Sequence, residues 1–295
     1  MAYREVVAVM DSSASSVRTV LLGGGYTLQR VARLLPAETF VMTSREKARC
    51  DEWRTYGWNA CQVSLDDPES LTRLLDTYLH IETIVDSVPP FRGVDDPSKG
   101  VRNVVRSLSG HHVRRIVYLS TTGVFGRRDG SIVDEDTAPA PWNAQGEARW
   151  RSECAYRESA CEVTAFRLPA IYGPDRGVAV SLRNGTYRLI GSGEIWTNRI
   201  HVEDLASAIE RALHTPHLPE VLCISDDRPA QAKEVVEYVC SREGLPWPPS
   251  ITEDEALRMG AYTMLSNQRV RNDRMKAVLG IALKYPSYRE GVVLT

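Results

Sequence analysis

Three consecutive glycines in the stretch LLGGGYTLQRVARLL are the first residues whose spacing could do chemistry. The stretch has the pattern of a strand, a glycine-rich turn and a helix. In this pattern Gly23 permits a tight turn, and Gly25 lets the backbone approach a pyrophosphate at the helix N-terminus. The third position of the G-x-G-x-x-G pattern is Leu28, which lacks the small side chain used for close packing. Because glycines also close ordinary turns, this stretch alone leaves both a phosphate site and a plain turn open.

The next apolar segment, TFVMT, ends in residues that favour one type of dinucleotide. Ser44 and Arg45 follow it directly, and Lys47 is close behind. A ribose with free hydroxyls usually meets Asp or Glu at this position, whereas Arg beside a hydroxyl suits a 2′-phosphate. The residues therefore predict NADP as the cofactor, with NAD less favoured. The alternative is that Arg45 only begins the solvated helix REKARCDEW.

The stretch RIHVEDLA contains two candidate substrate-binding residues, Arg199 and His201. An arginine can pair with a phosphate or carboxylate of a substrate, and imidazole titrates near neutrality. The competing interpretation is structural, because Asp204 lies near the start of the following helical pattern, where a carboxylate favours the positive end of a helix. Both interpretations of this stretch stay open at the level of the sequence.

The elements that must position these residues alternate between short apolar runs and amphipathic stretches, which is typical of βαβ units and a parallel sheet. Helical periodicity places Leu71, Leu74 and Leu75 on one face of SLTRLLDTYL. Shorter helices are expected near 203–213, 230–243 and 271–279. The predicted strands are 19–22, 39–43, 60–65, 83–88, 115–120 and 162–168.

The regular alternation ends after Pro174, and Gly and Pro become more frequent, which predicts a second, irregular lobe. The predicted fold is therefore α/β: a Rossmann-type doubly wound parallel sheet with a small C-terminal substrate lobe. We expect an N-terminal extension at 1–16 and an NAD(P)-binding Rossmann domain at 17–172. Residues 173–295 are expected to form mainly the substrate lobe, with some segments returning to the Rossmann domain.

Composition excludes several classes of partner. The 295 residues carry 36 Lys and Arg against 38 Asp and Glu, so the chain offers no broad basic field for nucleic acid. The apolar VVAVM near the N-terminus is too short for a secretory or membrane segment. The six cysteines are dispersed without metal-ligand spacing, so we expect reduced thiols and no metal site. These observations predict a soluble cytoplasmic protein that binds a small-molecule substrate.

Five motifs in order, GGGYTLQ, STTGVFG, RLPAIYGP, RIHVEDLA and YPSYREG, resemble the extended short-chain dehydrogenase/reductase superfamily. In particular, the chain is similar to its atypical, epimerase/dehydratase-like members. The similarity runs from about residue 17 to the C-terminus. It implies a Rossmann domain, a nicotinamide cofactor and a substrate lobe. Members often pair through two helices of the first domain, so the resemblance also implies a homodimer.

The resemblance implies site residues position by position. Thr121 falls where the family's substrate-orienting Ser or Thr lies, and Ser64 replaces the Asp that commonly meets the adenine amine. The other implied cofactor contacts are Gly23, Gly25, Tyr26, Thr27 and Leu28 at the pyrophosphate, Ser44 and Arg45 at the adenosine ribose, Ser87, Val88 and Pro89 along the cofactor, and Leu168, Pro169, Ala170 and Ile171 beside the nicotinamide.

The proton donor of the superfamily is missing from its usual place. Active members carry a Tyr four residues before a Lys in the helix after the VYG-type motif, and the Lys lowers the pKa of the phenol towards neutrality. The corresponding stretch here, APWNAQGEARW, contains no Tyr. Candidate substitutes are Tyr172 in IYGP as an acid and Glu147 or Arg149 as charged groups. Thr121 is a further candidate, as an orienting hydroxyl.

Three functions remain open from the sequence. The first is an NADP(H)-dependent oxidoreductase or epimerase/dehydratase-like enzyme with a non-standard acid or base, acting on a small hydroxy, carbonyl or sugar-type substrate. The second is a catalytically inactive NADP(H)-binding sensor or scaffold, which the absent Tyr–Lys pair favours. The third is a structural relic that binds no cofactor. Turnover is therefore not decided by the residues.

Overall fold

The computed structural model describes residues 15–91 and 93–292, so most of the expected N-terminal extension, residues 1–14, lies outside the described part. The described chain forms two compact units. The first contains the chain up to Ser120 together with Ala148–Ala165, and the second contains Thr121–Glu147 and the chain from Phe166 onward. The expected division into a cofactor domain at 17–172 and a substrate lobe at 173–295 stays a functional prediction.

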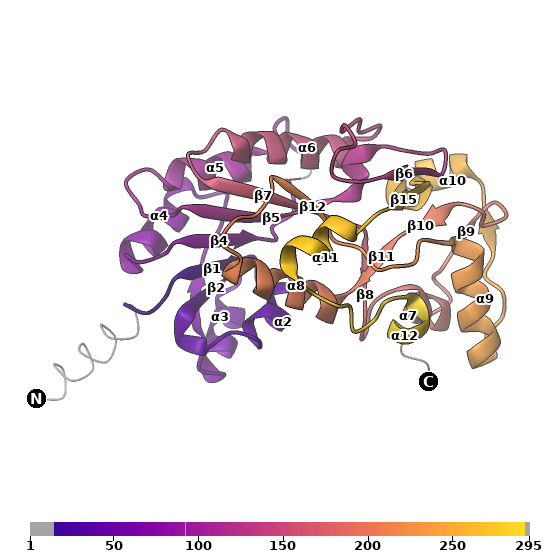
Figure 1. Cartoon of the computed structure of the whole chain (residues 1–295), viewed down its shortest axis with the longest axis horizontal. Helices are drawn as coiled ribbons and strands as arrows, with labels where there is room; N and C mark the ends of the chain where they lie inside the picture. The colour runs from indigo at the N-terminus through magenta and orange to yellow at the C-terminus, as the bar shows by residue number, and fades with distance from the viewer. Residues whose placement is uncertain (1–14, 92, 293–295) are drawn as a thin grey trace, which may run out of the picture. The chain divides into compact units, whose positions relative to one another are not determined.

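Parallel strands form the centre of the first unit (Figure 1). β3, β2, β1, β4 and β5 pair in this order, each parallel to its neighbour. β7 lies beside β5 in the sheet, and β12 of the second unit lies beside β7. The result is a seven-stranded sheet of order β12-β7-β5-β4-β1-β2-β3. The strands are β1 (Thr19–Leu22), β2 (Phe40–Ser44), β3 (Asn59–Gln62), β4 (Thr83–Asp86), β5 (Arg115–Thr121), β7 (Glu162–Leu168) and β12 (Val221–Cys223).

This strand order confirms the predicted Rossmann-type α/β fold. The order of the strands reverses between β1 and β4, and ligands of doubly wound sheets bind outside the carboxyl ends of the strands at such a point. All four residues of β1 are buried, as expected for a parallel strand that is covered on both faces. The carboxyl ends of β1, β2 and β4 are therefore where a ligand site is expected.

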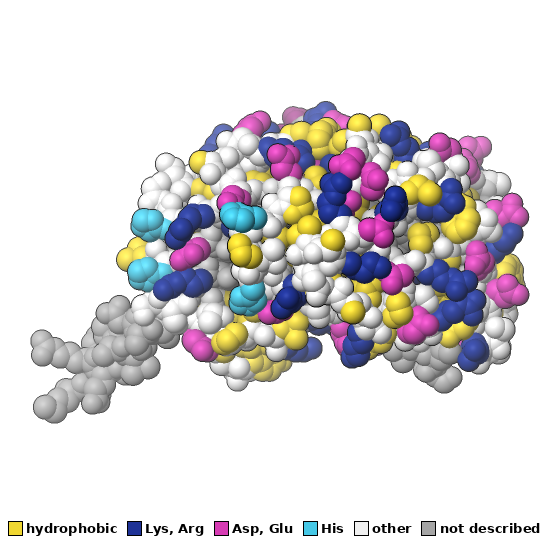
Figure 2. Space-filling model, viewed as in Figure 1, with side chains coloured by type: hydrophobic (Ala, Val, Ile, Leu, Met, Phe, Trp, Pro, Cys, Tyr) yellow, Lys and Arg dark blue, Asp and Glu magenta, His cyan; other side chains and the backbone are white. Residues whose placement is uncertain are grey.

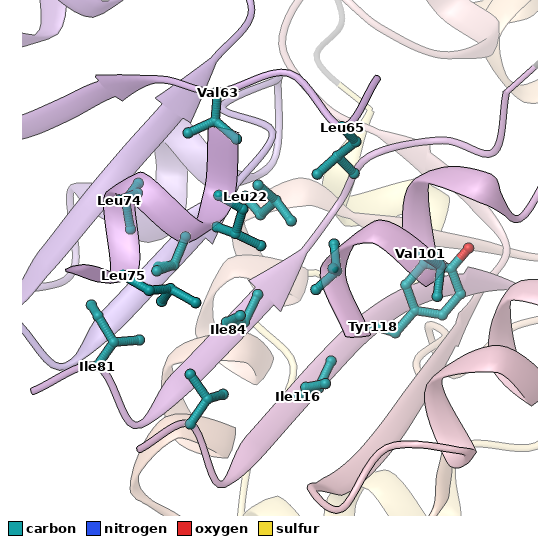
Figure 3. Close-up of a cluster of buried hydrophobic side chains, with 14 of the residues drawn as sticks. Leu22, Val63, Leu65, Leu74, Leu75, Ile81, Ile84, Val101, Ile116 and Tyr118 are labelled. Atoms are coloured by element: carbon teal, nitrogen blue, oxygen red, sulfur yellow. The ribbon is translucent and has the colours of Figure 1, made fainter. Parts of the chain in front are cut away.

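Amphipathic helices follow the strands of the first unit. Asp67 caps α4 by accepting a hydrogen bond from the Glu69 N–H. The predicted apolar face of α4 is buried in a core of aliphatic side chains (Figure 3), to which Val101 of α5 and Tyr118 of β5 also contribute. The helices are α2 (Leu28–Ala32), α3 (Lys47–Thr55), α4 (Pro68–Thr77), α5 (Lys99–Ser107) and α6 (Ala144–Arg157), which belongs to the first unit from Ala148 onward.

Two predicted strands end earlier than the apolar pattern suggested. β3 stops at Gln62 rather than at residue 65, and β4 stops at Asp86 rather than at residue 88. At the end of β4 the reason is local, because the Asp86 carboxylate accepts a hydrogen bond from the Val88 N–H and turns the chain. The side chains of Val63 and Leu65 still enter the core, so apolar residues continue beyond the strand.

The second unit is built from short strand pairs and helices. Its pairs are β6 (Ser131–Val133) with β15 (Gln268–Val270), β8 (Ala170–Tyr172) with β11 (Arg199–His201), β9 (Leu189–Ile190) with β14 (Ser250–Ile251), and β10 (Trp196–Thr197) with β13 (Ala230–Gln231). Its helices are α7 (Val178–Arg183), α8 (Val202–His214), α9 (Ala232–Glu243), α10 (Glu253–Arg258), α11 (Asp273–Leu279) and α12 (Tyr288–Gly291). The three helices predicted in this part of the sequence are confirmed as α8, α9 and α11.

The surface carries both signs of charge. On the face shown in Figure 2, acidic and basic side chains are interspersed. Within the described residues, no helix is both long enough and apolar enough to cross a membrane.

Candidate functional site

The turn after β1 is held by hydroxyl groups from two neighbouring strands. The Gly23 N–H donates to Thr43 Oγ1 (3.0 Å), and the Ser87 hydroxyl donates to the Gly23 carbonyl (2.6 Å). Gly23 has a φ of +85°, and a Cβ there would lie 2.8 Å from Cγ2 of Val88. Both the conformation and the lack of space therefore require glycine at this position.

The other two glycines of the turn have different surroundings. A Cβ on Gly24 would collide with the ring of Trp53 and approach Sδ of Met42 to 2.9 Å. A Cβ on Gly25 would meet no atom closer than the Gly23 carbonyl oxygen, at 3.9 Å. Gly24 thus serves packing, which the sequence pattern did not reveal, whereas Gly25 leaves the turn open on the side where a pyrophosphate would approach. The residues present therefore fit a dinucleotide at this turn.

The residues that follow the turn are held within the first unit. The ring of Tyr26 lies under the guanidinium of Arg30, 3.9 Å from ring centroid to Cζ, and Arg30 also donates to the Tyr26 carbonyl (2.7 Å). Thr27 and Leu28 are buried. Leu28 therefore contributes to the core at the position where the glycine pattern has its third small residue.

The residues after β2 include an exposed guanidinium. Arg45 is exposed, and no carboxylate of the described residues lies within ion-pair distance of it. Lys47, by contrast, contacts Asp51 at 2.6 Å. The Ser44 hydroxyl accepts a hydrogen bond from the Glu46 N–H (3.1 Å), which fixes the start of this loop. The arrangement leaves Arg45 available for an anionic ligand group.

Ser64 lies half-buried after β3. Its N–H donates to the Ser70 hydroxyl (3.0 Å), and its own hydroxyl accepts a hydrogen bond from the Asp66 N–H (3.4 Å). The family usually has an Asp at the position of Ser64. Here the nearest exposed carboxylate in the sequence is that of Asp66, two residues later.

Ser87, Val88 and Pro89 follow β4 beside the glycine turn, as the Gly23 contacts show. Beneath them lies Asp86, which is fully buried. Its carboxylate accepts hydrogen bonds from the Val88 N–H (2.8 Å) and from the Tyr156 hydroxyl (2.6 Å). Burial raises the pKa of Asp86 to about 6, although both hydrogen bonds and the charge of Arg149 favour its ionised form. Sequence reasoning missed this residue because it ends an ordinary apolar strand.

Arg149 reaches the carboxyl ends of β4 and β5 from α6. Its Nη1 donates to the Tyr118 hydroxyl (3.0 Å) and the Leu119 carbonyl (3.1 Å), and it lies 3.5 Å from the Val88 carbonyl. The residue four positions earlier is Gln145, so the spacing of the family's Tyr–Lys pair is occupied here by an amide and a guanidinium. The sequence offered Arg149 only together with Glu147 as a charged candidate on this helix, and the contacts with Tyr118 and Leu119 come from the structure.

The tyrosines of the first unit's core are poor proton donors at neutral pH. Burial raises the pKa of Tyr118, and it raises that of Tyr156 far above the ordinary range, with the neighbouring Asp86 carboxylate acting in the same direction. Neither phenol therefore replaces the missing acid near neutral pH.

The second unit holds the remaining residues predicted beside the nicotinamide or substrate. Thr121 accepts a hydrogen bond from the Gly123 N–H (3.1 Å), and Glu147 is half-buried on α6. Pro169 precedes β8, where Ala170 and Ile171 pair with Arg199 and Ile200 of β11. Leu168 is buried, whereas Ala170 is exposed. Their roles towards a ligand stay predictions.

Tyr172 and His201 lie in the interior of the second unit. The Tyr172 hydroxyl donates to the Ser287 carbonyl (3.0 Å), and burial raises the pKa of this phenol. His201 accepts a hydrogen bond from the Glu203 N–H (3.3 Å), which caps α8, and its ring lies 3.8 Å from that of Tyr285 between centroids. These contacts favour structural roles over proton donation by Tyr172 and substrate contact by His201.

Arg199 is 5% exposed, and its charge lies within the second unit. Its Nη2 donates to Thr197 (2.5 Å), its guanidinium lies 5.3 Å from the ring centroid of Tyr288, and its carbonyl accepts from the Asp226 N–H (2.8 Å). Burial raises the pKa of Asp226 to about 7, and the charge of Arg199 opposes this increase. The predicted pairing of Arg199 with a substrate anion would require this buried group to become accessible.

Among the described residues, no group of three or more His, Cys, Asp and Glu side chains is arranged to hold a metal ion.

Residues 20–224 match the model of the NAD dependent epimerase/dehydratase family, and the chain belongs to this family. This result confirms the resemblance to the extended short-chain dehydrogenase/reductase superfamily. It also places the chain in a family that binds nicotinamide dinucleotides.

Three relatives illustrate this membership. A functionally unknown conserved protein from Silicibacter pomeroyi is 32% identical and has a TM-score of 0.77, with 93% of this chain and 96% of that chain covered. A 3-diazoavenalumate denitrifying reductase from a Streptomyces species is 26% identical over 211 residues, which cover 66% of this chain and 69% of the relative. The Bordetella bronchiseptica enzyme WbmG, solved with NAD and UDP, is 18% identical with a TM-score of 0.75 over 94% of this chain and 92% of its own, a similarity of fold.

Proposed function

We propose that this chain binds NADP(H) and acts as an oxidoreductase or an epimerase/dehydratase-like enzyme on a small hydroxy, carbonyl or sugar-type substrate. Residues 17–172 would carry the cofactor, and residues 173–295 would supply most of the substrate contacts. The observation that carries the proposal is the turn at Gly23–Gly25, fixed by Thr43 and Ser87 and open at Gly25. Several proteins of this fold were solved with NAD, which supports a dinucleotide as the ligand.

The preference for the 2′-phosphate rests on Arg45. Its guanidinium is exposed after β2 and has no carboxylate partner among the described residues, so it can bind a phosphate without first losing an ion pair. A hydrogen bond to a charged group contributes about 1.5–3 kcal/mol, roughly ten- to a hundredfold in affinity. We therefore expect Arg45→Ala to weaken NADPH binding by about this factor and to leave NADH binding nearly unchanged.

Calorimetric titration of the purified, nucleotide-free protein with NADPH and NADH tests this prediction. Lys47→Ala is the matched control, because Lys47 is an exposed cation of the same loop that is already paired with Asp51. Equal losses in both variants would show that general charge, rather than a contact at Arg45, determines affinity. If the wild-type protein bound neither nucleotide, the proposed function would be abandoned and a structural relic would remain.

The absence of a tyrosine from the start of α6 supports a second candidate function, a catalytically inactive NADP(H)-binding sensor or scaffold. Bound NADPH that is never oxidised in a screen of carbonyl compounds, diazo compounds and nucleotide sugars would support the sensor. Inversion of a stereocentre in a substrate, without net redox change, would instead support an epimerase. When bound, the dinucleotide would donate or accept the hydride in an oxidoreductase reaction, and would accept and then return it in an epimerase reaction. Arg149 would contribute a fixed positive charge at the carboxyl ends of β4 and β5.

A further inference from the structure

Asp86 is a fully buried carboxylate to which the proposed function assigns no role. It occupies the last position of β4, directly before the loop that holds the glycine turn. One carboxylate oxygen accepts the Val88 N–H at 2.8 Å, and the other accepts the Tyr156 hydroxyl at 2.6 Å. Asp86 thus joins this loop to α6.

The loop above Asp86 makes two contacts with the glycine turn. The Ser87 hydroxyl donates to the Gly23 carbonyl at 2.6 Å, and Cγ2 of Val88 occupies the space that a side chain on Gly23 would need. The Val88 peptide lies between these contacts and Asp86. Its orientation therefore determines where Ser87 and the Val88 side chain meet the turn.

A small cavity and a few titratable or charged side chains adjoin Asp86 and influence its ionisation. A cavity of about 10 Å³, which has room for roughly one water molecule, lies beside the carboxylate and is also lined by Phe91 and Val101. The titratable and charged groups that face Asp86 are Tyr156 and Arg149 of α6 and Tyr118 of β5.

The ionised form of Asp86 is favoured mainly by hydrogen bonds rather than by a direct ion pair. Arg149 directs Nη1 to Tyr118 and Leu119 rather than to the carboxylate. Burial raises the pKa of Asp86 to about 6, so the group loses its charge under mildly acidic conditions. A hydrogen bond to an ionised acceptor is roughly twice as strong as one between neutral groups, so the contact with the Val88 N–H weakens on protonation.

We propose that Asp86 is a positioning residue for the nucleotide-binding turn at Gly23. Its ionised carboxylate holds the Val88 peptide in place, and the loop at Val88 in turn holds the Gly23 turn. Nucleotide affinity consequently depends on the ionisation of Asp86. This inference rests on the proposed binding of NADP(H) and adds to it a pH dependence located in one buried group.

Titration of the full chain with NADP⁺ between pH 5 and pH 8 tests the inference in the wild type, Asp86→Asn and Tyr156→Phe. The wild type should lose affinity as the pH falls through about 6, by roughly three- to tenfold beyond the change seen in Asp86→Asn. The comparison with Asp86→Asn removes the contribution of the ligand's own 2′-phosphate, which also titrates near pH 6. Asp86→Asn should bind more weakly than the wild type at pH 8, because it resembles the protonated carboxyl.

Tyr156→Phe separates positioning from a merely structural role. The variant keeps the contact between Asp86 and Val88 but removes a hydrogen bond that lowers the pKa of Asp86, so the loss of affinity should begin at higher pH. It also decides the question if Asp86→Asn does not fold, which circular dichroism at each pH would reveal.

Three outcomes have different meanings. Identical pH profiles in the wild type and Asp86→Asn would overturn the positioning role, as would a midpoint that does not move in Tyr156→Phe. A wild type that binds no nucleotide at pH 8 would instead refute the proposed function itself.

Discussion

Alanine substitutions at adjacent glycines should separate the stability of the glycine turn from its ability to bind a nucleotide. Neither Gly24 nor Gly25 has a positive φ, so alanine is compatible with the backbone at both positions. At Gly24 the added methyl group would collide with Trp53, whose side chain is buried, and approach Sδ of Met42. At Gly25 the methyl group would meet only the Gly23 carbonyl oxygen, at 3.9 Å.

The expected magnitudes differ accordingly. Overpacking of a core typically costs 1–3 kcal/mol, so Gly24→Ala should lower the free energy of unfolding by about this amount and the melting temperature by several degrees. Gly25→Ala should leave stability unchanged or increase it by up to about 1 kcal/mol, because alanine restricts the unfolded chain. The same methyl group would stand where the pyrophosphate approaches the backbone, so nucleotide affinity should fall by about tenfold or more.

Urea unfolding and calorimetric titration with NADP⁺ measure the two effects on the same proteins. A Gly24→Ala variant as stable as the wild type would show that Trp53 moves aside easily and that the packing argument is wrong. A Gly25→Ala variant that binds NADP⁺ normally would show that the open face of the turn is not the nucleotide face. Gly24→Ala should therefore fail in the unfolding assay, and Gly25→Ala in the binding assay.

Two further predictions concern buried groups of the second unit. Tyr172→Phe should cost about 1 kcal/mol of stability, because the hydrogen bond from the phenol to the Ser287 carbonyl is lost while that carbonyl keeps the Gly291 N–H. The variant should leave any turnover within about twofold, whereas a hundredfold loss of kcat would identify Tyr172 as the acid after all. Burial raises the pKa of Asp226 to about 7, above its value in the unfolded chain, so folding binds a proton between about pH 4 and pH 7. The resulting stabilisation is complete below about pH 4 and is lost as the pH rises through 7, with a slope of up to about 1.4 kcal/mol per pH unit. In a plot of the urea unfolding midpoint against pH, Asp226→Asn should show a smaller slope over this range. An unchanged slope in Asp226→Asn would show that Asp226 is not the group responsible.

Much of the first unit could be read from local patterns. The boundaries of β1 and β7 agree with the apolar runs from which they were predicted, and the buried face of α4 follows its leucine spacing. The glycine turn was equally visible, because the residue types that permit a tight turn and a close approach are few. Patterns of this kind work because the burial of alternate or continuous apolar residues determines both the element and its face.

The roles of individual site residues were harder to predict from the sequence. Gly24 looked like part of the phosphate pattern, yet its lack of a side chain accommodates Trp53, which lies far away in the sequence. Asp86 looked like the end of a strand, and only its contacts with Val88 and Tyr156 show that it supports the turn. Tyr172 and Arg199 carry side chains suited to chemistry, but both are buried among partners from the C-terminal segments.

The sequence by itself determined the fold class, the position of the glycine turn, the presence of Arg45 directly after the second apolar strand and the absence of the family's tyrosine from the start of α6. These features depend on residue type and local spacing, which a single chain displays directly. The tertiary structure decided which polar groups are buried, which hydroxyls hold the turn and where the charges of Arg149 and Asp86 lie. Those properties arise from contacts between residues distant in the chain, and the pKa of a buried carboxyl depends on such contacts rather than on its neighbours in sequence.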